Sequence, residues 1–83
     1  MKINEIIKVA RDKRGMAQSE LALRIGKSTR MIQKYESGEV IPNLEVLSEI
    51  AKALALVIRE ENTLDILITL VEILRYMEER END

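Results

Sequence analysis

Residues 29–34 carry the side chains best suited to recognising another molecule, because four of them hold hydrogen-bonding groups at short spacing. Arg30 can donate two parallel hydrogen bonds to O6 and N7 of guanine, and Gln33 can make a matching pair with adenine. Thr29 can offer its hydroxyl group to a base or a phosphate, or its methyl group to thymine. Together with Lys34, these residues fall on one side of a predicted helix, so we expect them to face the major groove of DNA.

Basic and hydroxyl side chains around this stretch are candidates for contacts with the DNA backbone. Lys27 and Ser28 come directly before it, and Lys13 and Arg14 lie at the end of an earlier predicted helix. Phosphate contacts of this kind fix the position of a protein on DNA without reading its sequence. Surface lysine and arginine are common in all proteins, so an ordinary solvated surface is the alternative at these positions.

The polar residues need a rigid support, and residues 18–37 predict one in the form of two short crossing helices. Gly26 can turn the chain sharply after the first helix, and the hydroxyl group of Ser28 can cap the second. Apolar residues at helical spacing mark the inner faces of both helices: Leu21, Ala22, Ile25, Ile32 and Tyr35. Two helices joined by a short turn with glycine indicate a helix-turn-helix unit, whose second helix enters the major groove.

Two further helices are predicted beside this unit. Residues 3–14 place their apolar side chains on one face. Pro42 disfavours helix in the residue before it, so another helix begins just after it, with Asn43 as the N-cap. Ala17 is a poor N-cap for the helix that follows it, since alanine cannot accept a hydrogen bond from the free amides. Residues 55–60 fit either a continued helix or a short strand, and their β-branched residues favour the strand.

The last predicted helix, residues 63–79, is more apolar than a helix packed on one small domain needs to be. Its apolar residues form two adjacent stripes, which include Ile66, Leu67, Leu70, Val71, Ile73, Leu74 and Met77. A second copy of the chain is the simplest cover for the second stripe, so these residues are the predicted dimer interface. The alternative is a fully buried core helix, for which a chain of 83 residues is short.

The charge of the chain is divided unevenly along its length. Residues 1–38 carry nine lysine or arginine residues against four acids, whereas residues 39–83 carry four against eleven. The first part is therefore net +5 and the second −7, which agrees with the overall charge of −2. This asymmetry favours a basic face for phosphates and an acidic remainder, with ordinary solvated faces as the alternative.

The composition excludes several classes of site. The chain contains neither cysteine nor histidine, which rules out disulfides, Cys- or His-based zinc sites and histidine-dependent catalytic triads. We therefore expect no enzymatic activity, no metal, no cofactor and no small-molecule ligand. The N-terminal residues are too charged for a signal peptide, and no apolar run reaches the length of a membrane span. The sequence thus predicts a cytoplasmic protein without a membrane partner.

Residues 2–54 resemble the lambda-repressor-like, Xre/Cro family of helix-turn-helix regulators. The resemblance rests on residues of different physical roles at the spacing of the family: Arg11, the run from Gln18 to Ala22, Gly26, Ser28, Ile32, Tyr35, Glu36, Gly38, Pro42 and the run from Ile50 to Leu54. It implies an all-α fold of five helices. Residues 1–60 would form the DNA-binding domain, and residues 61–83 a long C-terminal dimerisation helix packed on it.

The resemblance also implies roles for single residues. Gln18 would lie against the DNA backbone and brace the reading residues, while Arg11 and Glu36 would form a partly buried ion pair that supports them. Three features depart from the family: Ala17 replaces a capping residue, residues 55–58 lack a glycine, and the fifth helix is longer and more apolar than in many members. These departures leave the dimer geometry, and with it the operator spacing, open.

We therefore expect a transcriptional regulator, a repressor of the Xre type, that binds a palindromic operator in double-stranded DNA as a homodimer. Two alternatives compete with this interpretation. An antitoxin would autoregulate its operon through the same unit and hold a toxin on the extra apolar surface. An interaction module would use the same fold without DNA, and would show no salt-dependent affinity for it.

Overall fold

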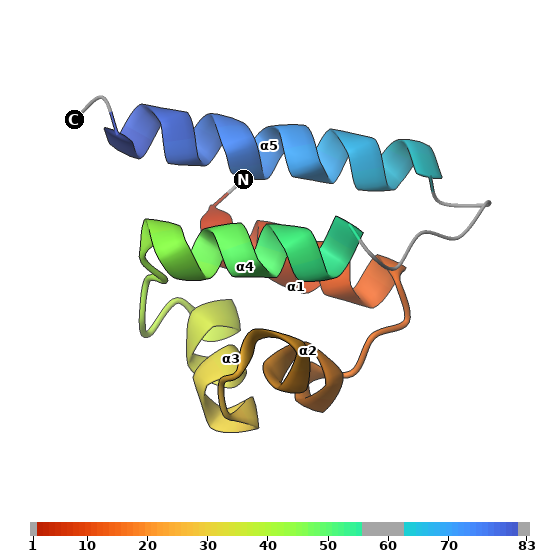
Figure 1. Ribbon diagram of the computed structural model, residues 1–83, viewed down its shortest axis with the longest axis vertical. Coiled ribbons are helices and arrows are strands. Elements are labelled where there is room, and N and C mark those ends of the chain that lie inside the picture. Colours follow the sequence, from red (N-terminus) through yellow and green to blue (C-terminus); the bar gives the residue numbers. More distant parts are fainter. Residues whose placement is uncertain (1, 56–62, 82–83) are drawn as a thin grey trace.

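The computed structural model describes residues 2–55 and 63–81, which form five α-helices and contain no strand (Figure 1). The helices are α1 (Ile3–Lys13), α2 (Gln18–Ile25), α3 (Thr29–Ser37), α4 (Leu44–Ala55) and α5 (Thr63–Glu81). The prediction of an all-α fold with five helices is therefore confirmed. α5 runs on to residue 81, past the predicted end at residue 79. The choice between strand and helix for residues 56–60 lies outside the described residues.

Local sequence explains where α2 and α3 begin and end. The Ser28 hydroxyl oxygen accepts a hydrogen bond from the Met31 backbone N–H at 3.1 Å and so caps α3. Gly26 and Gly38 end the two helices with φ angles of 68° and 84°, a left-handed conformation that residues with a Cβ rarely adopt. Ala17 lies at the N-cap of α2 without a side-chain hydrogen bond, as predicted.

The helices pack in three layers (Figure 1). α1 and α4 form the middle layer, α5 lies along one side of it, and α2 and α3 lie on the other. Asn43 starts α4, because its Oδ1 accepts a hydrogen bond from the Val46 N–H at 2.9 Å. The buried apolar core consists of Ile3, Ile6, Ile7, Ala10, Met16, Leu21, Ala22, Ile32, Tyr35, Val46, Leu47, Ile50, Ala53, Leu54 and Ile73. The middle layer supplies most of these residues, so it is the frame on which both outer layers rest.

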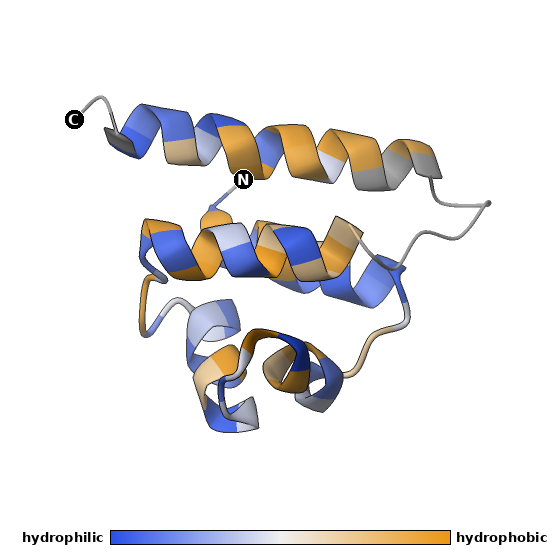
Figure 2. Cartoon of the chain, viewed as in Figure 1, coloured by the Kyte–Doolittle hydropathy of each residue, from blue (hydrophilic) through white to orange (hydrophobic). Residues whose placement is uncertain are grey.

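α5 has two different faces. Ile73 is fully buried against the core, and Tyr76 and Met77 pack beside it while half-buried. Hydrophobic residues are concentrated in the N-terminal part of α5 and hydrophilic residues in its C-terminal part (Figure 2), and several of the hydrophobic residues form an exposed apolar surface. We call this apolar surface the outer stripe of α5; it consists of Leu64, Leu67, Ile68, Val71 and Leu74, which are 71, 55, 50, 53 and 57% exposed. The alternative of a fully buried core helix is therefore wrong.

Candidate nucleic-acid interface

One side of α3 presents polar side chains to the surface. Arg30 and Gln33 are exposed, and Thr29 and Lys34 are half-buried beside them. A shallow recess of about 250 Å³ lies along this side and is lined by Arg30, Gln33, Lys34, Ser37 and Glu39. Among the residues that the structure describes, the side chains of Arg30 and Gln33 have no hydrogen-bond or ion-pair partner. Their donors therefore remain available to a ligand.

The other side of α3 is fixed in the core. Ile32 and Tyr35 are 0% and 4% exposed, which sets the direction in which the polar side faces. Lys27 and Ser28 lie at the surface just before the helix, as a phosphate-binding role requires. Because the Ser28 oxygen already caps α3, its hydroxyl proton is the group left to donate to a phosphate.

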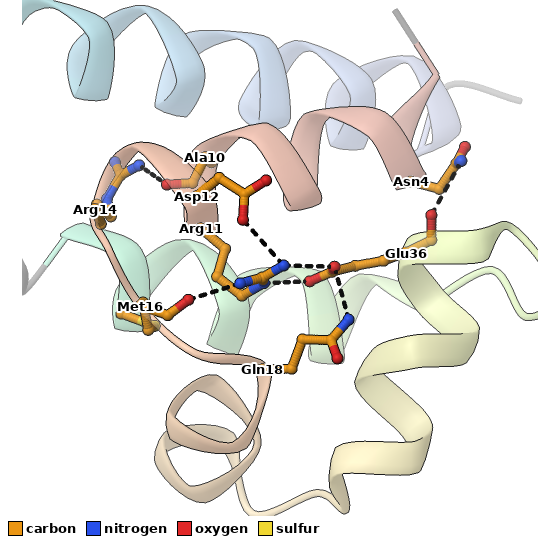
Figure 3. Close-up of polar contacts among 8 residues, drawn as sticks. All are labelled: Asn4, Ala10, Arg11, Asp12, Arg14, Met16, Gln18 and Glu36. Carbon is orange, nitrogen blue, oxygen red and sulfur yellow. Dashed lines mark hydrogen bonds and ion pairs between the residues drawn. The ribbon is translucent and has the colours of Figure 1, made fainter.

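Arg11 of α1 and Glu36 of α3 form a buried ion pair behind this surface (Figure 3). The Arg11 Nε donates to Glu36 Oε2 at 2.6 Å, and Nη2 donates to Oε1 at 2.9 Å. The remaining Nη1 donates to the Met16 carbonyl oxygen at 2.7 Å. The hydrogen bonds to Glu36 raise the pKa of Arg11 above its usual value. The guanidinium thus ties α3 to α1 and to the loop before α2.

Two further side chains converge on Glu36 (Figure 3). Gln18, the first residue of α2, donates from Nε2 to Glu36 Oε1 at 3.1 Å. Asn4 of α1 donates from Nδ2 to the Glu36 backbone carbonyl at 3.3 Å. Gln18 is half-buried and its amide is oriented by this bond. Gln18, predicted to lie at the DNA backbone, is therefore connected directly to the end of α3, the helix that carries the predicted base contacts.

Arg14 is buried, and its interpretation as a phosphate contact is wrong. It is 1% exposed; its Nε donates to the Leu54 carbonyl at 2.7 Å and its Nη1 to the Ala10 carbonyl at 2.6 Å. Burial lowers the pKa of Arg14 from its usual value. Nothing in the sequence indicates this role, because an arginine at a helix end normally points to solvent. Lys13, the other candidate, is exposed.

One acidic residue at the candidate interface was not predicted from the sequence. Glu39 is exposed and borders the same recess as Arg30 and Gln33. Its backbone N–H donates to the Ser37 hydroxyl at 3.3 Å, which holds the chain after Gly38 close to the end of α3. Glu39 directly follows Gly38, the glycine that ends α3, and this place in the sequence could have indicated that it lies near the exposed side of the helix.

The residues predicted as a dimer interface lie on two different faces of α5. Ile73 belongs to the core, with Leu70 and Met77 half-buried near it. Leu67, Val71 and Leu74 belong to the outer stripe, which Leu64 and Ile68 extend beyond the predicted set. The side chain of Ile66 lies outside the described residues.

Two other kinds of site are absent from the described part of the chain. Within residues 2–55 and 63–81, no three acidic side chains gather closely enough to hold a metal ion. In the same residues, every helix is too short or too polar to span a lipid bilayer.

The chain is similar in sequence to a helix-turn-helix family and to several known proteins. The sequence model of a helix-turn-helix family matches residues 7–57. The chain is 37% identical over 60 residues to multiprotein-bridging factor 1 of Schizosaccharomyces pombe, 36% over 59 residues to endothelial differentiation-related factor 1 of Homo sapiens, and 39% over 57 residues to multiprotein-bridging factor 1b of Arabidopsis thaliana. These matches cover 72, 71 and 69% of this chain but only 40% of each relative. No solved structure matches the chain.

Proposed function

Since this chain belongs to the lambda-repressor-like, Xre-type family of helix-turn-helix proteins, we propose that it is a sequence-specific DNA-binding regulator of transcription. In this proposal α3 lies in the major groove, as the second helix of such a unit does. The observation that carries the proposal is the free, exposed pair Arg30 and Gln33 on a helix whose opposite side is fixed in the core.

Each side chain of the interface has a distinct part in this proposal. Arg30 reads guanine and Gln33 reads adenine, because their forked donors and acceptors match those base edges. Thr29 and Lys34 lie on the same side and add contacts to bases or phosphates. Gln18, Lys27 and Ser28 bind the phosphates that set the position of the protein on the duplex.

The matched test compares Arg30→Ala with Lys52→Ala in binding to a duplex selected from random sequences. Lys52 is an exposed cation on α4, away from the proposed interface. Loss of one bidentate guanine contact costs about 1–3 kcal/mol, or about 5- to 150-fold in affinity, and relaxes selection at one base pair. Fluorescence anisotropy at fixed salt measures both variants. Equal losses of DNA affinity for Arg30→Ala and Lys52→Ala would show that α3 does not form the DNA interface.

We further propose that the chain acts as a homodimer through α5, with residues 1–60 as the DNA-binding domain. The support is the outer stripe, five large apolar side chains that remain 50–71% exposed. Burying them in both copies contributes about 1 kcal/mol per side chain, about 10 kcal/mol in total, against an association cost of about 4–15 kcal/mol. The two terms are similar in size, so burial of the stripe gives at most a weak, reversible dimer whose population depends on protein concentration. Occupancy of the DNA would follow protein concentration steeply.

A twofold dimer presents α3 twice, in inverted orientation, so we expect a palindromic operator with half-sites about one DNA turn, roughly 34 Å, apart. The test is Val71→Glu, which places a charge in the middle of the outer stripe. Ile41→Glu is its matched control, because Ile41 is 62% exposed but lies outside α5. Sedimentation should give a monomer for Val71→Glu and a dimer for the control, and selected DNA should change from palindromes to single half-sites.

If the wild-type chain is a monomer, that result would favour a different protein as the partner of the outer stripe. The name multiprotein-bridging factor, borne by two of the relatives, describes a protein that connects other proteins. A toxin held by an antitoxin is the other partner that this surface could serve. In both alternatives the outer stripe binds another protein. A stable wild-type dimer through α5 would occupy the stripe and therefore argues against both.

A further inference from the structure

We infer that two copies of α5 pack antiparallel, in a register centred on residue 69, with Leu67 of each copy against Val71 of the other. This inference rests on the proposed homodimer and specifies how its two halves meet. Four observations support it: the direction of the stripe, the spacing of its residues, its limits along the helix and the charges that follow it.

The outer stripe points away from the core. At about 100° per residue, Leu64 lies about 180° and Val71 about 160° around the helix from Ile73. Ile73 is fully buried against the middle layer, while Leu64 and Val71 are 71 and 53% exposed. A second helix can therefore approach this face without displacing any contact between α5 and the α1–α4 layer.

The stripe has the spacing of a helix-pairing seam. Leu64, Leu67, Val71 and Leu74 follow one another at alternating intervals of three and four residues. This repeat keeps side chains on the face that meets a partner helix, where they fit between the partner's side chains. At about 1.5 Å per residue, the seam is about 15 Å long. The seam is thus short and runs from Leu64 to Leu74. The positions of these two ends set the register in which two copies can pair.

Antiparallel pairing about residue 69 places apolar residues against apolar residues along the whole seam. Leu64 of one copy then faces Leu74 of the other, and Leu67 faces Val71. Beyond the seam each helix continues into Arg75, Glu78 and Glu79, and Arg75 and Glu78 are exposed on the same side as the stripe. In the antiparallel pair these charges extend past the partner's seam and do not meet their own copies.

Parallel pairing is disfavoured by charge. It would also match the two seams, but it would bring Arg75 against Arg75 and Glu78 against Glu78 at the same end of the dimer. Like charges directly opposite each other are unfavourable. The helix dipoles would also align side by side in a parallel pair, whereas an antiparallel pair places each positive helix end near a negative one. Both effects favour the antiparallel register.

The absence of cysteine from the sequence allows a direct test of this register. Two full-length variants, Leu67→Cys and Val71→Cys, are prepared separately and then mixed under mild oxidation. A disulfide requires Cα atoms less than about 7 Å apart, so only residues that face each other form one. Leu23→Cys provides the background of random collision, because Leu23 is 83% exposed on α2. Leu64→Cys with Leu74→Cys gives a second, independent pair in case one variant weakens the dimer.

The antiparallel register predicts covalent dimer in each mixture, and only the background level for any variant alone. Efficient crosslinking of Leu67→Cys with itself and of Val71→Cys with itself would overturn the register in favour of parallel pairing. A wild-type chain that sediments as a monomer would overturn the homodimer together with the register. DNA affinity measured on the same samples is a separate readout, so failure of the DNA-binding proposal is distinguishable from failure of the register.

Discussion

Replacing Glu36 with alanine should destabilise the protein by about 2–4 kcal/mol, because the change leaves a buried guanidinium without its main partner. The Glu36 side chain is 4% exposed and that of Arg11 is 10% exposed. The variant loses the two hydrogen bonds of 2.6 and 2.9 Å between them. Removing one partner of a fully buried pair costs about 3–5 kcal/mol. We expect somewhat less here, because Arg11 keeps the Met16 carbonyl at 2.7 Å and the exposed Asp12 carboxylate at 3.1 Å.

Urea unfolding of matched variants measures this loss. Glu20→Ala is the control, because it removes a surface pair in which Arg24 and Glu20 are 38 and 44% exposed. Such a pair within one helix contributes about 0.2–0.5 kcal/mol. A Glu36→Ala midpoint no lower than that of Glu20→Ala would refute the reasoning.

A double variant separates the cost of the unpaired Arg11 charge from the cost of lost packing at Glu36. Arg11→Met combined with Glu36→Met removes both charges and retains apolar volume, a replacement that is often neutral or stabilising. It should therefore be more stable than Glu36→Ala alone. A double variant less stable than Glu36→Ala would show that the cost comes from lost packing and not from the unpaired guanidinium.

Three further changes test other parts of the structure. Ala17→Ser should raise the free energy of unfolding by about 0.5–1 kcal/mol, seen as a higher urea midpoint, by capping α2, with Glu20 placed to complete a capping box; no gain would mean that α2 is capped in another way. Arg14→Met should cost about 1–3 kcal/mol, since the Leu54 carbonyl loses its donor in a buried site; a loss below about 0.5 kcal/mol would assign no net stabilisation to the guanidinium. Glu39→Ala should strengthen DNA binding in anisotropy titrations, because a carboxylate beside the reading residues repels phosphates; weaker binding would instead make Glu39 a base contact.

The helices were predictable wherever apolar spacing and end signals agreed. Ser28, Gly26 and Asn43 each act through their own local chemistry, so the bounds of the helices near them follow from the sequence. The two faces of α5 were also indicated, because 83 residues cannot surround a helix with so many apolar side chains. Which residues of that helix enter the core and which stay outside depends on how it is rotated on the middle layer, and only the structure settles that.

The position of Arg14 shows what local reasoning cannot reach. Its partners are Ala10, one turn earlier, and Leu54, forty residues further along the chain. Only the packing of α1 on α4 brings the Leu54 carbonyl within reach, and no spacing rule encodes that encounter. Arg11, only three residues earlier, could be placed because the family resemblance supplied its distant partner Glu36.

The three-layer arrangement separates two surfaces that natural selection can alter independently. The exposed residues of α3 and the outer stripe of α5 share no residue and lie on helices held apart by α1 and α4. Under the proposed function, a substitution on the stripe would change which protein the chain associates with and leave its DNA preference unchanged, and a substitution on α3 would do the converse. Gene duplication followed by divergence on either surface would yield paralogues that share targets but not partners, or partners but not targets.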